Sequence, residues 1–167
     1  MAGRTTMSEG RVAELIARLS LEPHPEGGYY REVHRSPSGV QPLDDRPSRA
    51  ALTTIYFLLA TGQHSRWHRV RSDEVWHFYE GDALELLVAD PSAAHVSSVT
   101  LAPLDRGVPV HVVAAGWWQA ARPLGRYALV GCTVAPGFDF ADFSFLRDEP
   151  DAATVLGDVR PDLASLL

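Results

Sequence analysis

The sequence predicts an all-β fold, a sandwich or a barrel, with one short helix near its N-terminus. From Ala51 to Val134, short runs of β-branched and aromatic residues alternate with Gly, Pro and Asp, and almost no helical pattern lies between them. With 167 residues and 46% hydrophobic content, the chain can bury the core of one domain. We expect a disordered leader at 1–8, a single domain at 9–147 and a C-terminal tail at 148–167 that is helical in part.

The composition argues against several classes of partner. The formal net charge is -6 and the charges are interspersed, whereas nucleic-acid binding and docking on anionic membranes both need a basic surface. Cys132 is the single cysteine of the sequence, so it cannot form an intrachain disulfide. The N-terminus lacks the apolar core of a signal peptide, and no apolar run is long enough to span a bilayer. We therefore expect a cytoplasmic protein.

The first expected elements are a helix, a turn and a strand. Apolar residues recur at helical spacing behind an N-cap at Ser8, which predicts a helix at Glu9–Leu19. The prolines and glycines of Pro23–Gly28 cannot continue that helix. Tyr29–His34 alternates like a strand, and Ser36–Ser48 is expected to be an exposed loop.

Eight further runs are expected to form strands, because β-branched and aromatic residues are concentrated in them and turn residues separate them. These runs are Thr53–Leu59, His64–Val70, Glu74–Tyr79, Ala83–Ala89, Val96–Leu101, Val108–Val113, Trp117–Ala121 and Tyr127–Val134. Many short strands with regular turns are typical of a sandwich or a barrel.

The segment Gly62–Gly81, GQHSRWHRVRSDEVWHFYEG, has the pattern of two strands joined by a tight turn, and it resembles the first motif of the cupin superfamily. The segment begins and ends on the two glycines of that motif. His68 and Glu74 stand at the places of the motif's first histidine and its glutamate, whereas Val70 replaces the second histidine.

Other stretches extend the resemblance. AAGWWQ is similar to the second cupin motif, Pro-x-Gly-x-x-His, with Ala114 in place of the proline and Gln119 in place of the histidine. Four long motifs together resemble a group of small, functionally uncharacterised cupins: PHPEGGYYRE (23–32), SRWHRVRSDEVWHFYEG (65–81), AAGWWQAARPLG (114–125) and YALVGCTVAPGFDFADF (127–143). The resemblance implies a double-stranded β-helix (jelly roll) barrel, usually paired into a homodimer, and it implies no established activity.

Strand alternation predicts which side chains face the barrel interior, because residues two positions apart share a face. Taking His68, Glu74 and Gln119 as inward predicts a pocket of four polar groups with three aromatic walls. Its members are Arg66, His68, Glu74, Gln119, Trp76, Phe78 and Trp117. Tyr29 and Arg31 are expected to close over the mouth and contact a small-molecule ligand.

The remaining candidates are expected outside the chemistry. His77 and Trp118 face outward by alternation, which predicts a position at or near a subunit contact. The strand that holds Tyr29 and Arg31 has a second interpretation, compatible with the first, in which it joins the sheet of its own or a partner subunit. Cys132 lies in an apolar run and is expected to be a buried, inert thiol.

Acid–base chemistry is the first function that such a pocket allows. Metal-free sugar-nucleotide epimerases of the cupin superfamily use a barrel histidine as base and a tyrosine as acid, and their basic-apolar-His run resembles Arg66-Trp67-His68. A histidine oriented by a carboxylate such as Glu74 can abstract a proton next to a carbonyl group, and Arg66 can hold an anionic group. The candidate acids are Tyr29, Tyr56 and Tyr127. We expect a protein that binds a small polar metabolite, with metal-independent isomerase or epimerase chemistry on a sugar-type substrate.

Two alternatives stay open. One is a metal-dependent cupin enzyme, a dioxygenase or an isomerase, with a divalent ion on His68, Glu74 and Gln119. Cupins often use three histidines and a glutamate, but valine cannot ligate and an amide carbonyl is a weak ligand, so no cofactor is favoured unless His64 or His111 assists. The other alternative is a non-catalytic ligand-binding protein.

Overall fold

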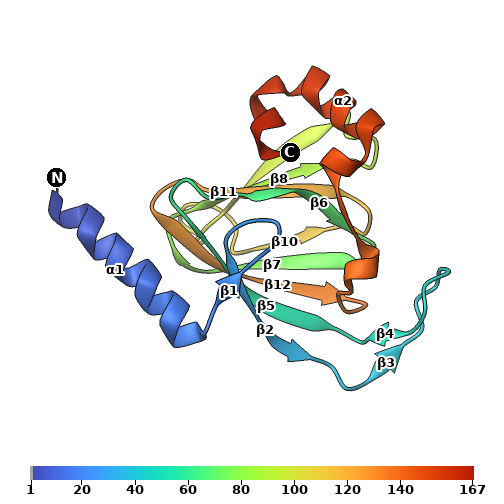
Figure 1. The fold of residues 1–167 in the computed structure, drawn as a ribbon, viewed down its shortest axis with the longest axis horizontal. Helices are drawn as coiled ribbons and strands as arrows, with labels where there is room; N and C mark the ends of the chain where they lie inside the picture. The colour runs from blue at the N-terminus through green and yellow to red at the C-terminus, as the bar shows by residue number, and fades with distance from the viewer. Residues whose placement is uncertain (1) are drawn as a thin grey trace.

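The structure, a computed structural model, describes residues 2–167, with side chains described from residue 10 onward. Two antiparallel sheets face each other and close into a jelly-roll barrel (Figure 1). In spatial order, the larger sheet contains β1 (Glu22–Pro23), β2 (Tyr29–Arg35), β5 (Thr53–Ala60), β12 (Tyr127–Ala135), β7 (Asp73–Gly81) and β10 (Val110–Val113). The smaller sheet contains β13 (Phe143–Phe145), β6 (Ser65–Val70), β11 (Trp118–Pro123), β8 (Leu84–Ala89) and β9 (Val96–Leu101). This architecture is the all-β barrel expected from the sequence.

Most strands lie where the residue pattern predicts them. Four of them, β6, β8, β10 and β11, begin one or two residues later than predicted. For β10 and β11 a turn residue explains the difference. β10 begins after Pro109, which has no N–H to give to a ladder. β11 begins after Gly116, whose φ of 79° belongs to the left-handed region that glycine tolerates. The expected loop at 36–48 carries β3 (Gly39–Val40), which pairs with β4 (Arg49–Ala50) in a small separate hairpin.

The N-terminal helix, α1 (Ala2–Leu19), begins earlier than the predicted start at Glu9. The helix therefore takes in residues that we expected to form a disordered leader, since no proline interrupts them. Leu15 of α1 packs with Leu58 and Leu129 of the larger sheet. Arg11 fixes the helix to β7, because its Nε and Nη2 donate to the two carboxylate oxygens of Glu80 at 2.7 and 2.8 Å.

The barrel interior has an apolar end and a polar end. On β5, Phe57 and Leu59 belong to the apolar core, whereas Thr53, on the same face, lines a cavity. On β12, Val130 faces the core and Val134 lines the cavity. Alternation therefore decides which side chains face inward, and the position along a strand decides whether they meet the core or the cavity.

The C-terminal residues form a second core on the outer face of the smaller sheet. η1 (Phe140–Asp142) precedes β13, and η2 (Leu146–Asp148), α2 (Pro150–Val159) and η3 (Pro161–Leu166) follow it. Figure 1 shows α2 above β8 and β11. These helical turns bury Trp67 and Trp118 against Leu146, Leu156 and Leu163. Helix in the tail was expected, but its packing against the barrel was not.

The expected position of Trp118 at a subunit surface is wrong. Trp118 does face away from the barrel interior, but its side chain is fully buried beneath the C-terminal helices, and its Nε1 donates to Pro91 O at 3.2 Å. Sequence alternation identified the face and could not identify what covers it. His77 is half-buried on the outer face of the larger sheet, where its ring stacks on Tyr79 at 6.5 Å between centroids. The subunit contact at His77 stays a prediction.

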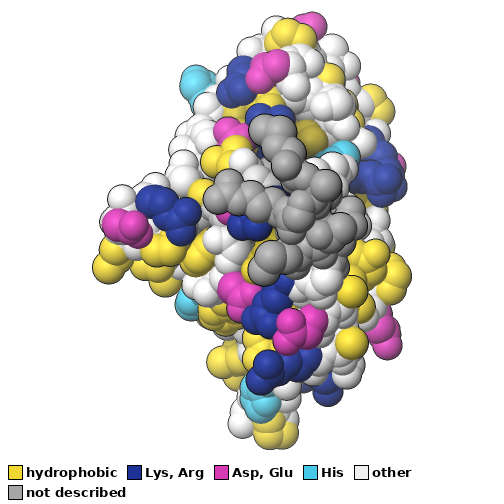
Figure 2. Space-filling view, turned by 90° about the vertical axis from the view of Figure 1, so that its left-hand side faces the viewer, with side chains coloured by type: hydrophobic (Ala, Val, Ile, Leu, Met, Phe, Trp, Pro, Cys, Tyr) yellow, Lys and Arg dark blue, Asp and Glu magenta, His cyan; other side chains and the backbone are white. Residues whose placement is uncertain are grey.

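The surface beside α1 has no large patch of one charge. Figure 2 shows basic and acidic side chains interspersed across this face, outside the grey residues. Among the helices that the structure describes, none combines the length and the apolar composition needed to cross a lipid bilayer.

The packing of α2 gives a direct test of the second core. Leu156→Ala removes a fully buried side chain, and we expect it to lower the free energy of unfolding by about 2–5 kcal/mol, as large-to-small core substitutions do. The matched control is Val159→Ala on the same helix, where the side chain is 44% exposed and the expected loss is about 0.5 kcal/mol or less. Urea unfolding of both variants measures the difference; equal losses would contradict the packing.

Candidate functional site

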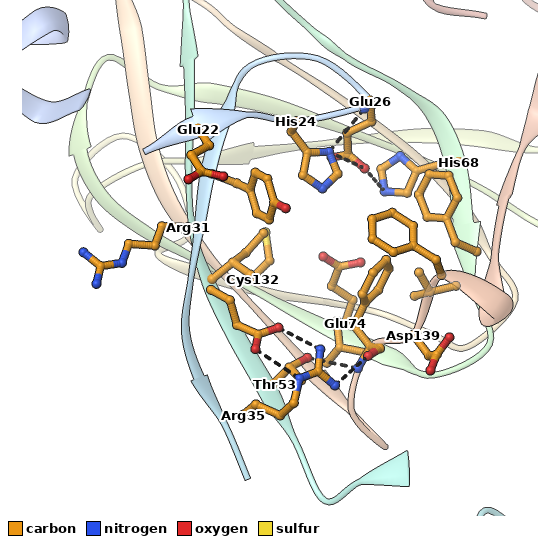
Figure 3. A pocket seen from close by; sticks show the side chains of 18 of the residues that line it. Glu22, His24, Glu26, Arg31, Arg35, Thr53, His68, Glu74, Cys132 and Asp139 are labelled. Atoms are coloured by element: carbon orange, nitrogen blue, oxygen red, sulfur yellow. Dashed lines mark hydrogen bonds and ion pairs between the residues drawn. The ribbon is translucent and has the colours of Figure 1, made fainter. Parts of the chain in front are cut away.

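The polar end of the barrel holds a cavity of about 660 Å³. Its walls come from the segment between α1 and β2, from strands β2, β5, β6, β7 and β12, and from the aromatic residues that precede and begin β13 (Figure 3). The lining residues with titratable side chains include His24, Glu26, Tyr30, His68, Glu74 and Cys132. A cavity of this size, with a few convergent polar groups, suits a small-molecule ligand.

Three of the predicted site residues line this cavity: His68, Glu74 and Arg31. Gln119 is fully buried directly behind them, as the hydrogen bonds below establish. Arg31 lies at the rim, where its Nη1 donates to Leu19 O at 3.2 Å. Figure 3 shows its guanidinium directed away from the histidine cluster.

The predicted aromatic walls are wrong in their position. Trp76 and Phe78 do face inward, but they lie at the apolar end of the barrel rather than at the cavity. Trp117 is 38% exposed and does not line the cavity, because it belongs to the turn before β11, where strand alternation does not apply. The aromatic walls are instead formed by Tyr30, Phe138, Phe140 and Phe143.

Arg66 and Tyr29 are also absent from the cavity lining. The pairing of β6 with β11 shifts register between Gln119 and Ala121, so that Ser65 turns inward in place of Arg66. The Arg66 side chain reaches Pro25 O instead, at 3.4 Å. Tyr29 packs against α1, while the next residue on β2 lines the cavity.

The three tyrosines that we expected as candidate acids also lie outside the cavity lining. None of the three lines the cavity: Tyr29 and Tyr56 pack in the cluster beneath α1, and Tyr127 donates to Glu80 Oε1 at 2.8 Å. Tyr30 is the tyrosine that lines the cavity, and its ring meets His24 edge-on at 4.4 Å between centroids.

His68 is held in one tautomer by its backbone contact. Its Nδ1 lies 2.7 Å from Arg66 O, and since a carbonyl oxygen can only accept, Nδ1 carries the proton. Nε2 is therefore the basic nitrogen of the neutral ring. Phe143 stacks on the ring at 5.3 Å with an interplanar angle of 18°, which fixes its plane. Burial lowers the pKa of His68, against the attraction of Glu74, so the ring is neutral near pH 7.

Glu26 is a site residue that the sequence analysis missed. Its Oε2 lies 3.2 Å from His68 Nε2 (Figure 3). Its Oε1 accepts a hydrogen bond from Ser65 Oγ at 3.0 Å. Burial raises the pKa of Glu26 to about 8, opposed by the Ser65 hydrogen bond. The carboxyl group therefore keeps its proton at neutral pH, next to the basic nitrogen of His68.

The turn that carries Glu26 depends on the two glycines that follow it. Gly27 has φ 114°, and a Cβ there would lie 2.1 Å from His64 O; Gly28 has φ 71°, and a Cβ there would lie 2.6 Å from Leu58 O. Only glycine allows the chain to approach β5 and β6 so closely. The PEGG sequence was the available signal, because a carboxylate between a proline and two glycines is fixed in a tight turn, but no periodicity indicates where that turn points.

Glu74 does not contact His68 as we expected, because Gln119 lies between them. Trp76 Nε1 donates to Gln119 Oε1 at 2.8 Å, and an indole N–H can only donate, so the amide N–H₂ of Gln119 must point the other way. That group donates to Glu74 Oε2 and lies 3.2 Å from His68 Nε2. Burial raises the pKa of Glu74.

His24 completes the polar cluster. Its Nδ1 accepts a hydrogen bond from the Glu26 backbone N–H at 3.2 Å. Burial lowers the pKa of His24 to about 4, and the charge of nearby His68 adds to this shift. Cys132 is buried beside the cluster, and burial raises the pKa of its thiol, in agreement with the expected inert role.

Ion pairs hold the rim of the cavity in place. Asp142, in the aromatic segment, accepts from Arg46 Nη1 at 3.2 Å and from Arg49 Nη2 at 2.8 Å. Arg35 at the rim is held by both carboxylate oxygens of Glu32 at 3.0 and 2.7 Å. The cluster of histidines and carboxyls is thus reached through a rim on which Arg35 is paired with a carboxylate and Arg31 donates to a backbone carbonyl.

The donors at the cupin ligand positions do not fit a cation. Val70 offers no ligand atom, and the Gln119 carbonyl oxygen is taken by Trp76, so Gln119 presents N–H groups to the space between His68 and Glu74. Within the part of the chain that the structure describes, no group of three or more His, Cys, Asp and Glu side chains is arranged to hold a metal ion. Of the expected alternative set of His68, Glu74 and Gln119, only His68 and Glu74 therefore present ligand atoms to this space.

Comparison with known proteins gives relatives along most of the chain. A yeast protein, the uncharacterized protein YML079W of Saccharomyces cerevisiae, is 26% identical over 159 residues, which cover 86% of this chain and 79% of the yeast protein. A hypothetical protein from Leishmania major is 34% identical, with a TM-score of 0.76 over 92% of this chain and 94% of that one. Protein SO0799 from Shewanella oneidensis is 33% identical, with a TM-score of 0.75 over 92% of both chains.

The strands that build the barrel also fall within the family match. Residues 13–146 match the family described as Cupin superfamily (DUF985). This range contains Glu26, His68, Glu74 and Gln119, and thus the whole polar cluster. The jelly-roll barrel, the motifs and the match agree, and the chain belongs to this DUF985 family of the cupin superfamily.

Proposed function

We propose that this cupin binds a small polar metabolite of sugar type in its barrel and catalyses metal-independent proton transfer on it, as an isomerase or epimerase does. The proposal rests on the tautomer of His68 and on the position of its basic nitrogen. Its Nδ1–H is bound to Arg66 O at 2.7 Å, and its basic Nε2 faces a neighbouring carboxyl group inside the cavity. A neutral, oriented and buried histidine is suited to take a proton from a carbon next to a carbonyl group.

The donor chemistry of Gln119 favours this function over a metal-dependent one. Divalent ions in proteins need several oxygen, nitrogen or sulfur lone pairs directed at one point. Gln119 instead directs N–H groups at that point, where they act as hydrogen-bond donors to Glu74 and His68.

His68→Gln tests the base. The variant keeps a polar side chain of similar size, so the fold should persist, and we expect at least about a 100-fold loss of proton transfer, the usual contribution of general base catalysis. The measurement is exchange of carbon-bound hydrogen for solvent deuterium, followed by NMR in small sugars that stabilise the protein in a thermal-shift screen. The matched control is His77→Gln on the outer face, for which exchange should stay unchanged.

The outcomes separate the two functional classes. Equal exchange in the parent protein and in His68→Gln removes His68 from the mechanism. Sugars that raise the melting temperature without any exchange or product indicate a non-catalytic binding protein.

Metal analysis tests the proposed independence of the reaction from metal ions. Because Gln119 directs donors at the site, we expect clearly less than one equivalent of transition metal in untagged protein prepared without chelators. We also expect that treatment with EDTA does not change the exchange of carbon-bound hydrogen in the sugars for solvent deuterium. One equivalent of metal, lost together with activity, contradicts the proposal.

A further inference from the structure

Two proton-transferring atoms in the cavity lie close enough to act on neighbouring atoms of one substrate. His68 Nε2 and Glu26 Oε2 are 3.2 Å apart, and both residues line the cavity. In a 2-hydroxy aldehyde or ketone, one carbon separates the carbon that loses a proton from the carbonyl oxygen that gains one. A base and an acid at this spacing can reach both atoms from one side of the molecule.

We propose that Glu26 is the general acid that works with His68, and that the substrate is a neutral aldose or ketose. The reaction assigned to the site is a 1,2-proton shift through an enediol, which interconverts the aldose and the ketose. This inference rests on the proposed proton-transfer function and adds to it a second catalytic residue and a substrate class.

The hydrogen bonds around Glu26 place its proton on the useful oxygen. Ser65 Oγ donates to Oε1 at 3.0 Å, so the proton of the carboxyl group sits on Oε2, which faces His68. Without substrate, this proton is directed at His68 Nε2, which also lies 3.2 Å from the amide nitrogen of Gln119. A substrate carbonyl oxygen that takes over the hydrogen bond from Glu26 would remove one of these two contacts of the base.

Each step balances without a further reactant. His68 Nε2 takes the proton from C2 of the aldose while Glu26 gives its proton to the oxygen on C1; the C2–H bond breaks and a C1=C2 double bond forms. In the second half, His68 returns the proton to C1 and the Glu26 carboxylate takes the proton from the oxygen on C2, which becomes the carbonyl group. Both residues regain their starting protonation.

Glu26 is favoured over Glu74 because of its contacts. Glu74 Oε2 accepts its hydrogen bond from Gln119, and within the described residues no hydrogen bond or ion pair joins Glu74 to His68. Glu74 is therefore one residue removed from the base. It can orient the amide of Gln119 but does not share a proton with His68.

The charges around the cluster favour an uncharged substrate. The cavity holds the carboxyl groups of Glu26 and Glu74, and among the side chains that the structure describes no arginine forms a hydrogen bond or ion pair with either carboxyl group. Arg35 at the rim is held by Glu32, and Arg31 is directed away (Figure 3). Among the described residues, a phosphate or carboxylate on the substrate would therefore meet no arginine side chain at the two carboxyl groups themselves.

Glu26→Gln tests the acid, because glutamine keeps the size of the neutral carboxyl group but has no acidic proton. The probes are neutral pentoses and hexoses, as aldoses and ketoses, incubated in D₂O and followed by NMR. We expect the parent protein to interconvert an aldose and its ketose with incorporation of solvent deuterium, and Glu26→Gln to slow this by at least about 100-fold. Glu85→Gln, on the outer face and paired with Arg122, should leave the rate unchanged.

Three results would overturn the inference in distinguishable ways. No exchange in any of these sugars contradicts the proposed function as well. Equal exchange in the parent protein and in Glu26→Gln, with loss in His68→Gln, leaves the base in place and removes Glu26. Inversion at one carbon without formation of the other sugar excludes the 1,2-shift.

The pH dependence of stability provides a readout that needs no substrate. The titratable groups facing Glu26 are His24 on its own turn, His68 on β6, Glu74 on β7 and Cys132 on β12. The folded pKa of Glu26, about 8, is raised above its ordinary value of 4.5, so its contribution to stability is lost as the pH rises through 8. The melting temperature of the parent protein should therefore fall relative to that of Glu26→Gln as the pH rises from 5 to 9. A difference between the two melting temperatures that stays constant over this range contradicts a neutral Glu26.

Discussion

The chemistry of this barrel depends on the orientation of one buried amide. Gln119 accepts from Trp76 Nε1 at 2.8 Å, and that bond forces its N–H₂ group toward His68 and Glu74. An unsatisfied donor or acceptor would be costly in a fully buried position. The hydrogen bonds to Trp76, His68 and Glu74 therefore hold the amide of Gln119 in this orientation. A hydrogen-bonding amide thus occupies the point where cupins with a metal site place a ligand atom, and this arrangement supports the proposed proton transfer.

The apolar end of the barrel supports this network. Trp76 belongs to both parts, since its ring packs on Phe57 at 6.1 Å between centroids and its N–H reaches Gln119. Close packing restricts the movement of the indole. Because the indole N–H is bound to the Gln119 amide, the amide is restricted as well. The polar end is closed by the turn that carries Glu26, which is fixed because Gly27 and Gly28 allow close approach to β5 and β6.

Burial gives the carboxyl groups and histidines their unusual protonation. Removal from water disfavours the charged form of each group, so Glu26 keeps a proton while His24 and His68 lose theirs. These three groups can therefore share one small cavity with little net charge. Such a set can exchange a proton with a neutral ligand without creating an isolated buried charge.

The sequence by itself determined the barrel, the inward direction of His68 and Glu74, and the replacement of metal-binding histidines by Val70 and Gln119, because strand periodicity and motif spacing are local properties of the chain. It could not place Trp117, which lies in a turn, or Arg66, which a register shift turns away from the cavity. Only the tertiary structure brought Glu26 next to His68, since their contact joins residues far apart in the chain through a turn that has no periodicity.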